Sequence, residues 1–188
     1  MTPEEEKEIL NRIKIHPQDF ALLYDAYYHP IFSYVFRRFG DYDLARDITA
    51  ETFLKAYQKI DRFIWRGIPV SAWLYRIATN EINLYLRKRK YAPTCIEDLG
   101  LKHFLVYDAG IETEKAAMEK ALQESKEFAA VQKKLSQMDI KYSEVIALRF
   151  FEEKQVKEIA LILNKNEGTV KSLLSRGLEK LRKALEEK

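Results

Sequence analysis

Glycine and proline are scarce in this sequence, with 6 and 5 copies among 188 residues. Folds built from many short strands need these residues at their tight turns, so their scarcity favours long helices. Cysteine is scarcer still, because Cys95 is the only one. One cysteine excludes an intramolecular disulfide and any zinc site built from several cysteines, and it fits a reducing cytoplasm.

Long apolar runs are also missing. No stretch approaches the roughly 20 apolar residues that a membrane-spanning helix requires. The first residues, MTPEEEKEIL, are acidic and lack the apolar core of a signal peptide. We therefore expect no membrane insertion and a cytoplasmic protein. The formal charge of +3 permits nucleic-acid binding without requiring it, because an acidic region can offset a basic one.

Catalytic motifs are absent as well. The histidines, His16, His29 and His103, are scattered, with no His-x-x-x-His or Glu-x-x-His pair among them. The sequence has no phosphate-binding G-x-x-x-x-G-K-[ST] loop and no G-x-S-x-G elbow. We expect no enzymatic activity, no cofactor and no metal.

The hydrophobic pattern predicts an all-α fold of two small domains. Three- and four-residue steps predict a helix from Pro17 to Phe39, which Pro30 should kink or split, then one helix after Asp41 and another from Ser71. We place the first domain at residues 1–91, a weakly patterned linker at 92–112, and a second domain at 113–188. The second domain should contain four helices. The first ends near Met138, and the other three span about 141–151, 156–163 and 167–185.

The last two predicted helices have the pattern of a helix-turn-helix. The turn, Asn164-Lys165-Asn166, provides a residue type that tolerates the left-handed conformation and then an N-cap. The next helix should turn Val170, Leu174, Leu178, Leu181 and Leu185 inward. Small hydroxyls and cations on its opposite side are typical of a helix that enters the DNA major groove. The alternative is an ordinary helical hairpin with a solvated basic side.

Two further clusters of polar residues lie in the first domain. Arg76, Asn80, Asn83 and Arg87 step by four, three and four, so they share one side of a helix, with amides for base edges and cations for phosphates. An acidic edge, Asp43, Asp47 and Glu51, suits a basic partner helix. For both clusters the alternative is a side of a helix that is simply solvated.

Several segments resemble the extracytoplasmic-function (ECF) class of bacterial RNA polymerase sigma factors. Those in the first domain are DITAETFLKAY (47–57) and WLYRIATN (73–80). Those in the second domain are YSEVIALR (142–149), EIA (158–160), GTVKS (168–172) and SRGLEKLR (175–182). One departure is Leu173, which stands where that family commonly has a basic residue.

The resemblance implies a transcription-initiation factor whose partners are core RNA polymerase and promoter DNA, and it also admits an anti-sigma protein. It assigns contacts to the promoter −35 element to the −35 face, defined as Thr169, Lys171, Ser172, Ser175 and Arg176. It assigns −10 recognition, with a flipped base held by the loop of residues 63–70, to Phe63, Trp65, Trp73, Arg76, Asn80, Asn83 and Arg87. It assigns polymerase binding to Asp43, Asp47, Glu51 and Phe53.

Two other kinds of protein remain as alternatives. A free-standing helix-turn-helix regulator would explain the C-terminal domain but neither polar cluster of the first domain. An adaptor that binds polymerase without DNA would leave the basic side of the last helix unexplained.

Overall fold

The computed structural model describes residues 1–63, 68–91 and 126–186, and this part of the chain is helical, with no strand. The all-α prediction is therefore confirmed. The predicted linker, residues 92–112, lies outside the described residues. The N-terminal helices are α1 (Pro3–Ile13), α2 (Phe20–Phe39), α3 (Tyr42–Lys59) and α4 (Val70–Tyr91), with 3-10 turns η1 (Pro17–Asp19) and η2 (Ile60–Arg62). The C-terminal segment contains α6 (Lys126–Gln137), α7 (Ile140–Ile146), the π-helical turn η3 (Ala147–Phe151), α8 (Val156–Leu163) and α9 (Glu167–Glu186).

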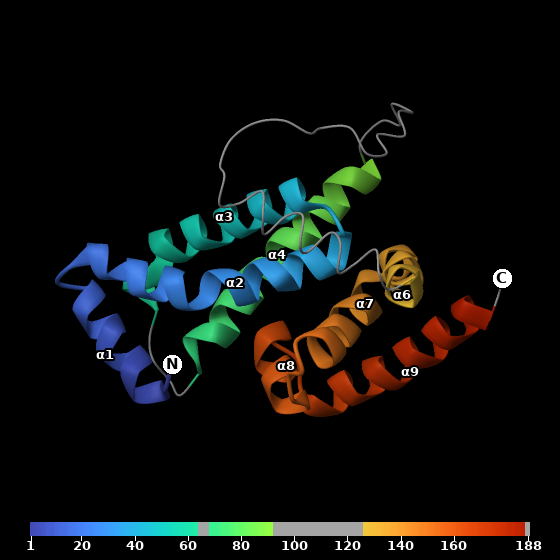
Figure 1. The fold of residues 1–188 in the computed structure, drawn as a ribbon. Coiled ribbons are helices and arrows are strands. Elements are labelled where there is room, and N and C mark those ends of the chain that lie inside the picture. Colours follow the sequence, from blue (N-terminus) through green and yellow to red (C-terminus); the bar gives the residue numbers. More distant parts are fainter. Residues whose placement is uncertain (64–67, 92–125, 187–188) are drawn as a thin grey trace.

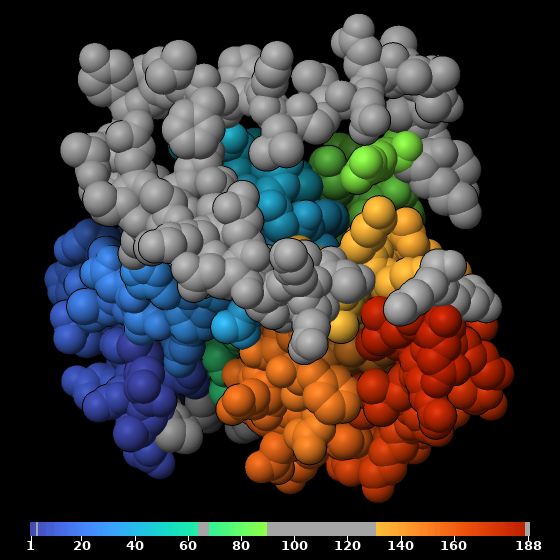
Figure 2. Space-filling view, turned by 45° about the vertical axis from the view of Figure 1, so that its right-hand side comes forward, coloured from blue at the N-terminus to red at the C-terminus, as the bar shows by residue number. Residues whose placement is uncertain are grey.

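The two groups of helices lie directly against each other (Figures 1 and 2). Helices α2, α3 and α4 pack together in the first group, and α6 to α9 form the second. Contacts between the groups run from α4 to α8 and from α2 to α6 and η3. Periodicity in the sequence predicts each group separately but says nothing of this contact.

Helix α1 was not predicted, although its start carries a capping signal. The hydroxyl of Thr2 accepts a hydrogen bond from the backbone N–H of Glu5 at 3.2 Å, and the Glu5 carboxylate accepts one from the Thr2 N–H at 2.7 Å. This reciprocal capping box satisfies two amides that the first turn would otherwise leave unpaired. The T-x-x-E spacing at residues 2–5 was the signal that could have revealed it.

Helix α2 continues through Pro30, so of the two predicted outcomes, a kink or a split, the split does not occur. Proline removes one hydrogen bond from the helix ladder and crowds the preceding turn. Side chains before and after Pro30 are buried in the core: Leu23 precedes it, and Ile31 and Val35 follow it. Because both halves pack into one core, the helix remains one element.

Gly40 ends α2 in the left-handed conformation, at φ 68°. A Cβ atom added there would lie 3.0 Å from the side-chain oxygen of Gln132 on α6. The position therefore disfavours any side chain on two grounds, backbone conformation and space.

Gly40→Ala should lower the free energy of unfolding by about 1–2 kcal/mol, because a non-glycine residue pays for the left-handed conformation. Urea unfolding measures the change. Gly168→Ala is the matched control, since its added Cβ would meet nothing closer than an Asn166 oxygen at 3.6 Å. Equal stability of the Gly40→Ala and unmodified proteins would contradict the argument.

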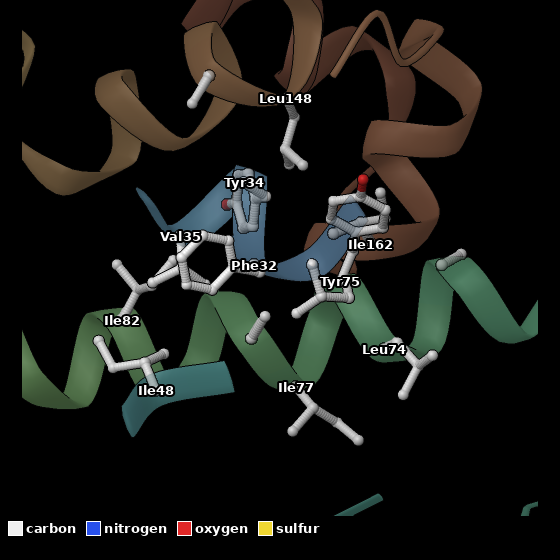
Figure 3. Close-up of a cluster of buried hydrophobic side chains, with 14 of the residues drawn as sticks. Phe32, Tyr34, Val35, Ile48, Leu74, Tyr75, Ile77, Ile82, Leu148 and Ile162 are labelled. Carbon is white, nitrogen blue, oxygen red and sulfur yellow. The ribbon is translucent and has the colours of Figure 1, made fainter. Parts of the chain in front are cut away.

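The core extends across both groups of helices (Figure 3). Leu148 and Ile162 of the second group are almost fully buried, and they lie beside Tyr34 and Tyr75 of the first. Leu178 and Leu185, predicted to turn inward, are instead 40% exposed, and for them the prediction is wrong. The three- and four-residue steps of the sequence also place Tyr24 and Tyr57 inward, and they too are more than 40% exposed. A helical stripe is wider than the area that a neighbouring helix covers, so residues at its edge remain in solvent.

Candidate nucleic-acid interface

The helix-turn-helix forms as the sequence predicts. Asn164 ends α8 in the left-handed conformation, with φ 53°. The side-chain oxygen of Asn166 then accepts a hydrogen bond from the Thr169 N–H at 2.7 Å, which caps the start of α9. Val170, Gly177 and Leu181 are buried and fix which side of α9 faces inward.

The −35 face lies on the opposite side of α9. All five of its residues, from Thr169 to Arg176, are exposed in the structure. The first three turns of the helix thus present hydroxyls and cations to solvent, at the end where a recognition helix approaches base edges. The structure therefore brings the predicted −35 residues together on one accessible side.

The close approach of α9 to α7 depends on Gly177, which the sequence analysis did not single out. A Cβ atom there would lie 3.1 Å from Ile146 Cδ1 and 3.3 Å from Tyr142 Cβ. The missing side chain lets the two helices pack tightly. This contact helps to hold the −35 face in position on its domain.

Of the four residues predicted to share one side of α4, two contact the second domain and two are exposed. We call Arg76, Asn80, Asn83 and Arg87 the −10 face. Asn80 and Arg87 are exposed. Arg76 instead donates hydrogen bonds to backbone carbonyls at the end of α8, and Asn83 donates to the Glu144 carboxylate at 3.2 Å. Half of the −10 face is thus in contact with the C-terminal domain.

A pocket of about 360 Å³ opens beside Arg76. Phe63 and Trp73 line it, with ring centroids 4.7 Å apart, as do the apolar residues Ile68 and Ala72. Lys59 and Arg62 add two cations that the sequence analysis missed, although both lie within four residues of the start of the predicted base-binding loop. Trp65, also predicted for this site, lies outside the described residues. Aromatic and cationic walls suit a nucleic-acid base with its phosphate.

Leu161 of α8 forms another part of the pocket wall. It belongs to the C-terminal domain, whereas the other lining residues belong to α3, α4 and the segment between them. The pocket is therefore partly closed by the second domain.

The acidic edge lies on α3. Asp47 is exposed, Asp43 and Glu51 are half-buried, and the Glu51 carboxylate pairs with Lys55 at 3.1 Å. Phe53 is only 3% exposed and packs on Phe20 and Tyr24, so it supports the helix from within and presents no surface to a partner.

Two apolar side chains beside the acidic edge are exposed instead. Leu54 is 51% and Tyr57 47% exposed. Leu54 follows Asp47 by seven residues, so the two lie on the same side of α3. An exposed apolar strip bordered by carboxylates is a typical protein-binding surface.

The described residues contain no group of three or more histidine, cysteine, aspartate or glutamate side chains able to hold a metal ion. Over the same ranges, no helix combines the length and apolarity needed to cross a membrane.

Comparison with known proteins assigns both halves of the chain. The family model for sigma-70 region 2 matches residues 23–91, and that for sigma-70 region 4 matches residues 128–181. The ECF RNA polymerase sigma factor SigW of Bacillus subtilis is 36% identical over 186 residues, which cover 95% of this chain and 96% of SigW. RNA polymerase sigma factor YlaC of the same organism is 32% identical, over 89% of this chain and 92% of YlaC.

A solved structure shares the fold. The sigma factor RpoE of Bartonella quintana, in complex with the anti-sigma factor NepR, aligns with a TM-score of 0.63 and 23% identity, over 90% of this chain and 98% of that one. The two regional models match in the order that the sequence motifs predicted, and the similarity to SigW extends over nearly the whole length of both proteins. The chain belongs to the ECF class of RNA polymerase sigma factors.

Proposed function

We propose that this sigma factor directs core RNA polymerase to promoters by reading the −35 element with α9 and the −10 element with α4 and the neighbouring pocket. The observation that carries this proposal is the presence, on separate domains of one chain, of two surfaces suited to DNA. In this scheme residues 1–91 bind polymerase and the −10 element, residues 92–112 connect, and residues 113–188 read the −35 element. The protein acts in the cytoplasm as a non-enzymatic initiation factor.

The −35 face supports major-groove recognition through its chemistry. Arg176 and Lys171 offer donors to guanine edges and phosphates, while Thr169, Ser172 and Ser175 are short enough to let the helix approach the bases. All five are exposed, so duplex DNA reaches them without a rearrangement of the domain.

The −10 site supports capture of an unstacked base. Unstacking costs about a few kcal/mol, and contacts to the extruded strand offset this cost. The aromatic rings of Phe63 and Trp73 provide stacking surfaces, and Lys59, Arg62 and Arg76 provide charge for the backbone. Asn80, one turn along α4 from Arg76, offers an amide for the next base.

The proposed polymerase surface combines the carboxylates of Asp43, Asp47 and Glu51 with the exposed apolar side chains of Leu54 and Tyr57. Acidic residues steer a basic partner helix and fix its register, whereas buried apolar area supplies affinity. Phe53 has no direct part in this surface, because it is buried.

Asp47→Lys should weaken binding to core polymerase by about 1 kcal/mol, and the loss should shrink as salt rises, because exposed charges are screened. Titration of labelled protein with core polymerase at two salt concentrations measures this. Glu8→Lys, an equal charge reversal on an exposed position of α1, is the control and should bind normally. Equal losses for the two variants would point to a general effect of net charge and refute the α3 surface.

The proposal as a whole is tested by comparing DNA binding with and without polymerase. The protein alone should bind duplex promoter DNA poorly, and addition of core polymerase should produce a specific complex at a defined start site. Tight binding of the isolated protein to duplex DNA as a dimer would instead support a free-standing regulator.

A further inference from the structure

We infer that the C-terminal domain of the free protein masks part of its −10 face, namely Arg76 and Asn83, and that an exchange of helix caps between the two domains holds this closed state. The inference depends on the proposed function, because it assumes that the −10 face binds promoter DNA. The contacts that carry it are hydrogen bonds between side chains of one domain and helix ends of the other.

The first cap runs from the N-terminal domain to α8. The Nε atom of Arg76 donates to the Ile162 carbonyl at 3.1 Å, and its Nη2 atom donates to the Leu161 carbonyl. These carbonyls end α8, where the last turn leaves acceptors unpaired and favours a positive charge. While Arg76 fills this position, two of its donors are unavailable to a phosphate or base.

The second cap runs in the opposite direction. The side-chain amide of Gln132, on α6, donates to the carbonyls of Arg37 at 2.9 Å and Phe36 at 3.3 Å. These carbonyls lie in the last turn of α2, the helix that Gly40 ends. Each domain therefore donates side-chain hydrogen bonds to carbonyls in the last turn of a helix of the other domain, where the helix ladder leaves acceptor capacity.

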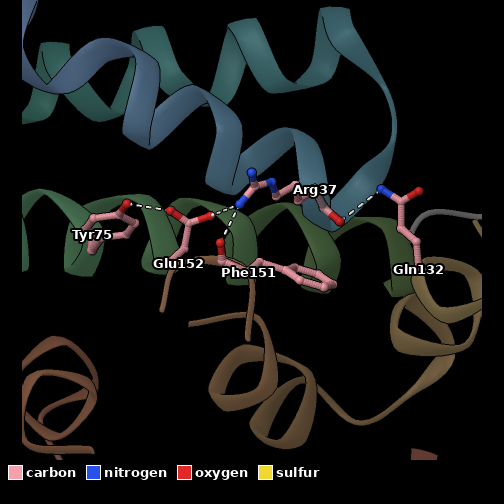
Figure 4. A network of polar contacts seen from close by, with 5 residues as sticks. All are labelled: Arg37, Tyr75, Gln132, Phe151 and Glu152. Carbon is pink, nitrogen blue, oxygen red and sulfur yellow. Dashed lines mark hydrogen bonds and ion pairs between the residues drawn. The ribbon is translucent and has the colours of Figure 1, made fainter. Parts of the chain in front are cut away.

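A carboxylate adds a further contact between the domains: Figure 4 shows Glu152 beside Tyr75 and Arg37, with Gln132 at the Arg37 carbonyl. Glu152, which follows η3, accepts a hydrogen bond from the Tyr75 hydroxyl at 2.7 Å and pairs with Arg37 at 3.4 Å. Arg37 also donates to the Phe151 carbonyl. The Glu152 side chain is only 7% exposed in this contact, and its burial raises its pKa despite the hydrogen bond from Tyr75 and the charges of Arg37 and Lys154.

The closed state masks the DNA surfaces unequally. On the −10 side, Arg76 caps α8, Asn83 bonds to Glu144, and Leu161 narrows the pocket. On the −35 side, all five residues of the face are exposed. The free protein therefore leaves α9 exposed while the site proposed to capture the separated strand is partly covered.

The contact between the two domains contains buried polar groups, and these favour its separation. Arg38 and Glu144 are both buried. The Arg38 guanidinium donates a hydrogen bond to the Ser143 hydroxyl at 3.1 Å across the contact. Within the described residues, Arg38 Nη1 and Asn83 Oδ1 are buried without a hydrogen-bond partner. Such groups regain hydration when the domains part, which offsets part of the cost of exposing Leu148 and Ile162. Binding to polymerase and promoter would then complete the opening.

Distances between spin labels test the closed state directly. Labels at Arg46→Cys and Ser136→Cys, both exposed, in a Cys95→Ser background would report on the separation of α3 and α6. The free protein should give one short-distance population. Gln132→Ala and Glu152→Ala should each add a longer-distance population, and Gln137→Ala, an exposed glutamine on the same helix, should not. A short distance kept by both interface variants, or a broad distribution in the unaltered protein, would overturn the inference.

Strand binding tests the consequence of masking. The probe is the single-stranded −10 segment of a promoter identified by run-off transcription. Opened variants without polymerase should bind it about tenfold more tightly than the unaltered protein, because apparent affinity scales with the binding-competent fraction. Equal binding by closed and opened proteins, with normal binding by the holoenzyme, would refute masking alone. Failure of the holoenzyme to bind the strand would refute the proposed −10 function itself.

Discussion

Arg176→Ala should weaken binding of the holoenzyme to a promoter by about 1–3 kcal/mol, which is roughly 5- to 150-fold in affinity. The guanidinium is exposed on the outer side of α9, two turns from its N-terminus. An arginine at this place can form two parallel hydrogen bonds with a guanine edge, and alanine leaves those acceptors unpaired in the groove. The loss should depend on the −35 sequence.

Promoter binding and initiation by the reconstituted holoenzyme measure this effect, on templates with intact and scrambled −35 elements. Arg182→Ala is the matched control, because Arg182 is exposed on the same helix and pairs with Glu186 at 2.9 Å. We expect the control to bind almost normally. If Arg176→Ala bound an intact promoter as well as the unaltered protein does, the assignment of α9 as recognition helix would be wrong.

Asn80→Ala should impair promoter opening while leaving polymerase binding intact. Asn80 is exposed on α4 between Arg76 and Arg87, so its amide can bond to a base of the separated strand. Loss of such a contact costs about 1–3 kcal/mol, or roughly 5- to 150-fold in the fraction of open complex. Duplex binding through the −35 face should persist.

Permanganate footprinting detects unpaired thymines and so reports opening. Asn11→Ala, the same substitution at an exposed position of α1, is the control. Normal melting by Asn80→Ala, with normal affinity for polymerase, would remove Asn80 from the −10 face. Reduced binding to core polymerase by both variants would indicate a fault in folding.

Local structure in this protein follows closely from its sequence. Asn164 and Asn166 were predicted to turn and to cap, and they do both. The outward side of α9 was predicted from the inward leucines and valine, and it is exposed, although Leu178 and Leu185 are exposed too. These features depend on contacts within one or two helical turns, which a sequence pattern records.

Contacts between the domains could not be predicted in the same way. Arg76 and Asn80 look equivalent in a helical pattern, yet one caps α8 and the other is exposed. Which side of a helix is covered depends on residues roughly ninety positions away, and no local period encodes that placement.

The closed state gives a physical reason for a sigma factor to act only with polymerase. If the domains hold each other's helix ends, strand capture requires their separation, and the free protein would not trap single-stranded DNA elsewhere. Gln132 and Glu152 would then set how readily the protein opens. Neither residue belongs to the proposed DNA or polymerase surfaces, so their effects can be measured separately from recognition.

The central claim is that this chain converts core RNA polymerase into an enzyme that starts at defined promoters. Run-off transcription with core polymerase on fragments of the host genome tests it most directly. We predict discrete transcripts that require the added protein and disappear when both Arg176 and Asn80 are replaced by alanine. Failure of the protein to associate with core polymerase, or an unchanged transcript pattern in its presence, would contradict the account.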